Sequence, residues 1–200
     1  DVSRNLIIGI AAAEDITTAN SCVLIGGRAE FKNNGDDNVA VGFRALYNNT
    51  TGINNVAIGR DAFYTNTTGA YNVASGYNAL YSNLDGERNV AHGTEALYFN
   101  TSGDDNVGIG HNANRGRTGH TASLTTAVGT KALFINTTGD QVTALGAYAC
   151  KENTTGDDNT GVGYGALQNN ETGANNTAVG VQALYNHTGG TTTAVGMKAG

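Results

Sequence analysis

The residues of this chain that could perform chemistry are few and scattered. The segment 161–166, Gly-Val-Gly-Tyr-Gly-Ala, has the glycine spacing of a dinucleotide-binding loop. Such a loop needs a crossover helix and a downstream acidic partner, and neither pattern follows it. The four histidines have no acid or nucleophile at a constant spacing: His92, His111, His120 and His187. We therefore expect no enzymatic activity, no catalytic residue and no cofactor.

Acidic turns offer a second possible chemistry, which is calcium binding. The sequence Gly-Asp-Asp-Asn begins at Gly35, Gly103 and Gly156, and carboxylate-rich turns can hold calcium. The three copies lie three or four repeat units apart, whereas calcium-binding repeats place carboxylates in successive units. We therefore interpret these residues as turn caps and expect no metal site.

A basic stretch is the best candidate for binding a partner. Residues 106–139 contain no Asp or Glu and include Arg115, Arg117 and Lys131, in a chain of net charge −6. Arginine binds carboxylate or phosphate through its forked guanidinium, and loops on rigid scaffolds often carry function. We predict that Arg115, Arg117 and His120 contact an anionic surface glycan or a neighbouring component. The alternative is a tolerated insertion without function.

All of these residues belong to one repeat that fills the chain. Twelve glycines end short β-favouring stretches, and eight of the eleven spacings between them are 17 residues, the others being 16, 19 and 16. We number each unit from its anchor glycine as position 0. The anchors are Gly9, Gly26, Gly42, Gly59, Gly76, Gly93, Gly110, Gly129, Gly146, Gly163, Gly180 and Gly196. A fixed period of this kind is typical of a stacked solenoid.

The positions of the unit differ in character. Positions −3 to −1 alternate large, small, large, as in Val56-Ala57-Ile58, which is a strand pattern. Position +3 is Ala in all twelve units, +4 is mostly Leu or Phe, and +5 is mostly Tyr or Phe. A second glycine near +10 ends an Asn-Thr-Thr-Gly turn. We predict an all-β fold, a parallel β-solenoid (β-roll) of about twelve 17-residue coils with two strands per coil.

The recurring small residues have expected roles in this fold. The anchor glycine should supply a backbone angle or a close chain approach that a Cβ would forbid. Alanine at +3 should form a tight corner beneath the next coil. The turn glycine should adopt a positive φ, while Asn and Thr bond local backbone. Cys22 and Cys150, about 34 Å apart at the coil spacing, should form no disulfide.

Composition excludes several classes. The chain has no Pro, only 14% charged residues and no long apolar run, so we expect no membrane insertion, and the negative charge argues against nucleic acid. The sequence starts at Asp1 without Met and stops inside a coil. We interpret residues 1–200 as a single repeat domain, a fragment of a longer fibre protein, with an irregular coil and a loop insertion at residues 111–128.

The unit N-N-V-A-I-G-x-x-A-L-Y-x-N-T-T-G resembles repeats of two related groups, from about Leu6 to Gly200. One is the head domain of trimeric autotransporter adhesins, in which V-A-I-G-x-x-A units form a left-handed parallel β-roll. The other is the repeat region of phage tail fibres, which the longer Tyr and N-T-T-G turn favours. The resemblance implies a homotrimer and an extracellular or virion location. The small residues at −2 would allow close approach between chains.

One column adds a possible pocket. Position −1 is aliphatic in ten units, but two consecutive units carry Ser75 and His92. If this column faces a threefold axis, three copies of each residue could hold water or an anion. The alternative is a tolerated polar pair satisfied by water.

We therefore expect a structural and adhesive fibre segment, from a phage tail fibre or a surface adhesin, that mediates host or surface attachment. One alternative is a self-assembling extracellular filament without a receptor, because open solenoid ends are unpaired strand edges. A third is ice binding, which the sequence disfavours because adjacent threonines face opposite ways and Leu84-Asp85 interrupts the Thr pair.

Overall fold

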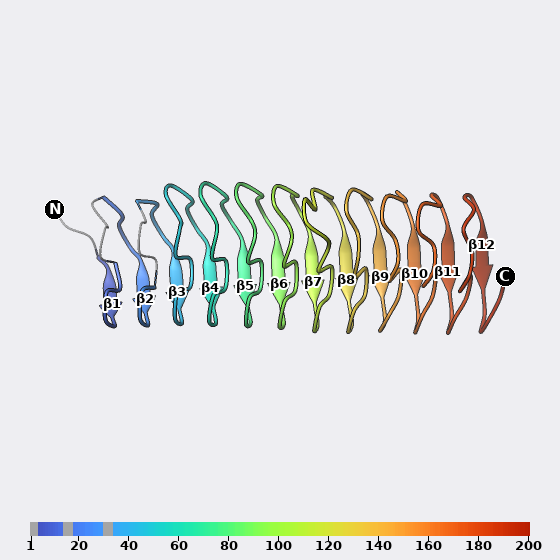
Figure 1. The fold of residues 1–200 in the computed structure, drawn as a ribbon, viewed down its shortest axis with the longest axis horizontal. Helices are drawn as coiled ribbons and strands as arrows, with labels where there is room; N and C mark the ends of the chain where they lie inside the picture. The colour runs from blue at the N-terminus through green and yellow to red at the C-terminus, as the bar shows by residue number, and fades with distance from the viewer. Residues whose placement is uncertain (1–3, 14–17, 30–33) are drawn as a thin grey trace.

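The computed structural model describes residues 4–13, 18–29 and 34–200. Twelve short parallel strands stand in sequence order along one axis, one strand in each coil (Figure 1). The described residues contain no helix. The strands are β1 (Leu6–Ile8), β2 (Val23–Ile25), β3 (Val39–Val41), β4 (Val56–Ile58), β5 (Val73–Ser75), β6 (Val90–His92), β7 (Val107–Ile109), β8 (Thr126–Val128), β9 (Thr143–Leu145), β10 (Thr160–Val162), β11 (Thr177–Val179) and β12 (Thr193–Val195). The predicted all-β parallel solenoid is confirmed.

The coils stack in strict register. Val56 of β4 lies opposite Val73 of β5, 17 residues later. The offset is 16 residues in the β2–β3 and β11–β12 pairs. Across the irregular coil, Val107 of β7 lies opposite Thr126 of β8, 19 residues later. The extra residues therefore leave the sheet unshifted and are accommodated elsewhere in that coil.

The prediction of two strands per coil is wrong, because the described residues of each coil contain one three-residue strand. In the apolar segment after the anchor glycine, every second residue has a positive φ instead. Arg44 at +2 and Leu46 at +4 both have φ of 55°. The Arg44 N–H donates to Gly27 in the preceding coil, at 3.0 Å, and the Leu46 N–H donates to Ala62 in the following coil, also at 3.0 Å. The segment thus satisfies its backbone between coils without forming a strand.

Two glycine columns are required for different reasons. Gly59 has φ of +132°, and a Cβ there would lie 2.6 Å from the carbonyl oxygen of Gly76, so both parts of the anchor prediction are confirmed. The turn glycine Gly52 does not have a positive φ, which contradicts the prediction. A Cβ on Gly52 would lie 2.3 Å from the carbonyl oxygen of Gly69, so close stacking is what excludes a side chain there.

The interior of the roll is thin and made of small residues. Ala57 at −2, Ala62 at +3 and Phe63 at +4 are fully buried, as are their counterparts in the neighbouring regular coils. The buried +3 column agrees with the predicted corner. The −2 column lies inside its own chain, so these residues cannot provide close contact between chains as predicted. The core falls into two clusters, one ending at Leu97 and the other starting at Ala113.

Candidate functional site

The outward side of the sheet, which we call the outer face, consists of the side chains at −3 and −1 of every strand. Because side chains alternate along a strand, the buried −2 alanines leave both neighbours pointing outward. Position −1 is the more prominent column, with Ile58 44% exposed, whereas Val56 at −3 is half-buried. The outer face is therefore a mainly β-branched strip with a ridge at −1. It is carried by the row of strands β1 to β12 in Figure 1.

The outer face changes character along the rod. Position −3 is Val from β2 to β7 and Thr from β8 to β12. The threonines are Thr126, Thr143, Thr160, Thr177 and Thr193, paired in register. We missed this column in the sequence because only the paired threonines of the turns were considered, although its constant place three residues before the anchor glycine was visible.

Ser75 and His92 lie side by side on the outer face, directly opposite each other in the β5–β6 pairing. Val73 and Val90 lie beside them at −3, and Ile58 and Ile109 occupy −1 in the flanking coils. His92 is exposed and Ser75 half-buried. His92 is also the only ionisable residue within the twelve described strands. The predicted neighbourhood is confirmed, and the enclosed pocket stays a prediction.

Arg115 is held by its neighbours rather than presented to solvent. It takes position +5, where the four preceding coils carry Tyr. Its guanidinium carbon lies 5.2 Å from the ring centroid of Tyr98 and 4.7 Å from that of Phe99. Its Nε donates to Glu95 Oε2 at 2.9 Å. Glu95 thus neutralises Arg115, one of the three basic residues of the predicted belt. Arg117, in the bulge formed by residues 117–119, is exposed.

His120 lies inside the roll, so its predicted place in a surface binding site is wrong. The side chain is fully buried, with Nδ1 3.1 Å from Asn100 Oδ1. Its backbone pairs with Asn100 as an isolated bridge. Burial lowers the pKa of His120 to about 4. His120 therefore substitutes for a structural asparagine and cannot contact a glycan.

Two buried asparagine ladders are the feature that sequence reasoning missed most completely. At −4, the Asn55 side chain donates to Gly69 at 2.8 Å and its backbone N–H donates to Asn38 Oδ1 at 2.9 Å. At +7, Asn66 donates to Asn49 Oδ1 at 2.7 Å. The predicted local turn contacts are present at +7, where Asn66 also donates to the carbonyl oxygen of Gly69 in its own turn at 3.0 Å. The bonds that join successive coils were not predicted. Constant asparagine at a fixed position was the available signal.

The irregular coil interrupts both ladders and the apolar core at once. Asn114 takes the +4 position of the core leucines and donates to Thr125 Oγ1 at 2.6 Å, and Thr125 donates to Asn106 Oδ1 at 2.5 Å. Thr125 and His120 occupy the places of the ladder asparagines. This polar layer separates the two apolar clusters that end at Leu97 and begin at Ala113.

The tyrosines at +5 form a ladder whose ring faces are already covered. Tyr47, Tyr64, Tyr81 and Tyr98 stack with centroids 5.1–5.2 Å apart and planes within 10°. Burial raises the pKa of Tyr81 and Tyr98. The stacked rings offer only their edges to a ligand, whereas sugars bind on exposed aromatic faces. We therefore interpret this ladder as stiffening the rod and not as a sugar-binding surface.

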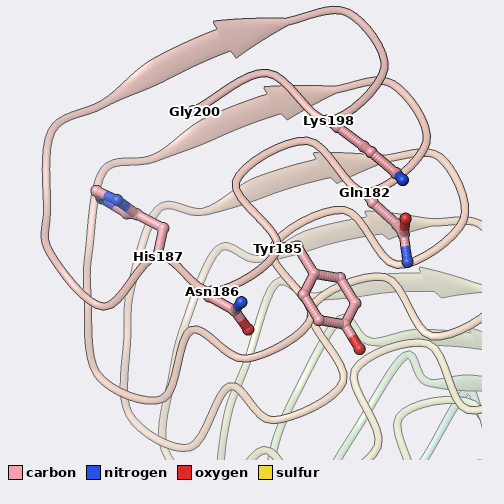
Figure 2. A pocket seen from close by; sticks show the side chains of 6 residues that line it. All are labelled: Gln182, Tyr185, Asn186, His187, Lys198 and Gly200. Carbon is pink, nitrogen blue, oxygen red and sulfur yellow. The ribbon is translucent and has the colours of Figure 1, made fainter.

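A cavity of about 440 Å³ opens at the last coil, and Figure 2 shows its lining side chains. His187 lies on the opposite side of this coil from Lys198 and Gln182 in that view. The cavity is the open end of the stack, where no further coil of the described chain covers the interior, so its residues form no convergent site.

The acidic turns act as caps, as predicted. Asp36 accepts a hydrogen bond from the backbone N–H of Asn20 at 2.8 Å, and Asp104 accepts one from Glu87 at 2.7 Å. These caps join neighbouring coils. Across residues 4–13, 18–29 and 34–200, no group of three His, Cys, Asp or Glu side chains could hold a metal ion. Cys22 and Cys150 are both buried.

Comparison with protein-family models, with curated proteins and with solved structures gives no match for this chain. The described residues also include no helix of the length and apolarity needed to cross a membrane. The outer face, the Ser75–His92 pair and the 117–119 bulge are therefore the features from which a function can be argued.

Proposed function

We propose that this chain is a structural and adhesive segment of a homotrimeric fibre, of the phage tail-fibre or surface-adhesin kind, that works outside the cell or on a virion. The outer face is the observation that carries the proposal. Its strip consists mainly of Val, Ile and Thr and runs through all twelve strands without an acidic side chain. A long, largely apolar strip of this kind marks an interaction surface.

A second copy of the same chain fits this surface. The outer face has no charge to be matched by a differently charged partner, and its −1 ridge repeats with each coil, so an identical rod offers a complementary repeat at the same spacing. Three copies with their −1 ridges turned to a common axis would bury the ridges in a closed assembly. The number three comes from the repeat's resemblance to trimeric fibres.

Attachment would use the surface that remains outside. The bulge at residues 117–119 lies between positions +6 and +7, away from the outer face, and Arg117 is exposed there. An exposed guanidinium on a rigid shaft is suited to a carboxylate or sulfate of an anionic surface glycan. Arg117 is therefore the residue of the predicted trio that we retain for binding.

Light scattering tests the assembly. We expect a particle of three times the chain mass of 20.5 kDa, independent of concentration. Ile58→Lys with Val128→Lys should give monomers, because both residues lie on the ridge. The matched control Thr94→Lys, at an exposed position off the outer face, should remain trimeric. A monomeric natural sequence would overturn the proposal, and growth with concentration would favour the filament alternative.

Ice binding is the second candidate, and the threonine column of β8–β12 is the observation that favours it. Five in-register hydroxyls, about 4.8 Å apart, alternate across each strand with aliphatic side chains at −1. This function needs the outer face free. Thermal hysteresis in a monomeric preparation would support ice binding, and its absence together with a trimer would exclude it.

A further inference from the structure

We propose that Ser75 and His92 fix the register of identical chains that meet through the outer face. The inference rests on the proposed self-association and adds which residues decide how the copies align. Ser75 and His92 are the polar break in an otherwise aliphatic −1 ridge, and they occupy directly paired positions of β5 and β6. Their place is asymmetric along the row of strands, so it can distinguish one alignment from another.

Burial makes this polar pair selective. An imidazole or hydroxyl taken out of water needs a hydrogen-bonding partner, and aliphatic neighbours cannot supply one. When copies align in parallel and in register, His92 and Ser75 of one copy meet His92 and Ser75 of the next. The layer then contains imidazole and hydroxyl donors and acceptors from every chain. A single buried polar position fixes alignment in coiled coils by the same means.

An antiparallel alignment removes those partners. Pairing the twelve strands end for end places β6 against β7 and β5 against β8, so His92 meets Ile109 and Ser75 meets Val128. The −3 column disfavours the same alignment independently, because threonines of β8–β12 would then lie against aliphatic residues of β1–β5.

A parallel alignment slipped by one coil is also penalised. Ser75 of one chain would face Ile58 or His92 of its neighbour, and His92 would face Ile109 or Ser75. Each slip therefore leaves an imidazole and a hydroxyl against isoleucine. Without the polar pair the −1 ridge would be aliphatic throughout, and neighbouring registers would differ little in apolar contact.

Disulfide trapping measures the register directly. Chains carrying Val128→Cys and chains carrying Val162→Cys are co-refolded and oxidised. The two positions lie two coils apart, about 9.6 Å at the strand spacing, which exceeds the span of a disulfide. In-register assemblies therefore give only 128–128 and 162–162 links. The 128–162 links report a slip of two coils, in which Ser75 and His92 meet only aliphatic side chains of the −1 ridge.

We expect 128–162 links to be at least about tenfold rarer than same-site links in the natural background, corresponding to about 1.4 kcal/mol. In the Ser75→Ile, His92→Ile background, the mixed links should rise several-fold while the particle stays trimeric and melts at a higher temperature. His92→Asn, which keeps a polar group, should retain the natural pattern. The swap Ile25→Val with Val41→Ile on the same ridge is the matched apolar control.

The outcomes separate the two proposals. Equal amounts of mixed links in the natural and double-isoleucine backgrounds would overturn the register role. A trimer that gives no links at either cysteine would show that the −1 ridge does not meet its copies, which also overturns it. A monomer by light scattering would instead remove the proposed assembly. The native Cys22 and Cys150 are buried, and a chain without added cysteines controls for their reaction.

Discussion

Acid should weaken this fold through His120. The imidazole is fully buried in the irregular coil, and its Nε2 has no hydrogen-bond partner among the described residues. Burial holds the pKa of His120 at about 4, whereas a histidine in an unfolded chain titrates near 6.5. Between these values the unfolded chain binds a proton that the folded chain does not. The free energy of unfolding must therefore fall as the pH falls from about 6.5 to 4.

The size of the effect follows from the two pKa values. A shift of about 2.5 units corresponds to about 3.4 kcal/mol per chain in total, of which about 2.5 kcal/mol is lost by pH 4.5. His120→Asn should abolish this loss, because it introduces the residue that regular coils carry at +7. It should leave the protein at least as stable near pH 7.5.

Denaturant unfolding followed by circular dichroism at pH 7.5 and pH 4.5 measures both values. Carboxylates also titrate in this range, so the quantity to compare is the difference between the natural sequence and His120→Asn at each pH. The exposed His111 provides the matched control, and His111→Asn should show nearly the same pH dependence of the free energy of unfolding as the natural sequence. An identical pH dependence for the natural sequence and His120→Asn would refute the assignment of a buried neutral imidazole.

Three further predictions concern the shaft. Ala96→Leu should overpack the buried +3 column and lower the free energy of unfolding by about 1–3 kcal/mol, and a neutral effect would show that the corner is roomy. Arg115→Ala should destabilise the rod by about 1 kcal/mol, because it removes the contacts with Glu95 and Tyr98, while Arg117→Ala should leave stability unchanged and weaken binding to acidic glycans on an array. Gly59→Ala should cost about 1–3 kcal/mol or more in thermal unfolding, since its Cβ would lie 2.6 Å from a carbonyl oxygen; unchanged melting would mean that the coils can separate locally.

The sequence predicted the architecture because one constraint repeats in every coil. Gly59 and ten equivalent glycines lie against the backbone of the next coil, so the period appears in the sequence wherever the contact exists. The Val-Ala-Ile pattern likewise marks a strand with one buried and two outward side chains. These features depend on a single residue type at a single position, and periodicity alone therefore reveals them.

The missed features depend on which coil a side chain bonds to, and a repeat hides that choice. Asn66 and Asn49 occupy the same position of successive units, so local and intercoil bonding give the same sequence pattern. The segment from Arg44 to Leu46 looked like a second strand because its apolar residues are close together. Only the φ of 55° at Arg44 and Leu46 distinguishes it from one, and neither Arg nor Leu gives a sequence signal for that conformation.

The length of the irregular coil reveals it in the sequence, but the sequence analysis placed Arg115 and His120 on the surface. A basic composition indicated a surface belt, whereas Arg115 follows the tyrosine column and His120 follows the asparagine column into the stack. The column that a residue occupies in the repeat is a better guide to its burial than its charge. The column of His120 is hidden in the sequence, because the bulge at residues 117–119 precedes His120 and shifts it out of the regular spacing.

The placement of this bulge explains how a fibre shaft can vary without losing its assembly surface. Val107 and Thr126 remain paired across the irregular coil, so the extra residues leave the −3 and −1 columns continuous. The cost appears in the interior instead, where Asn114, Thr125 and His120 form a polar layer between the two apolar clusters. An insertion is therefore tolerated where the chain turns away from the outer face. The same insertion near the strands would break the ridge on which identical copies are proposed to meet.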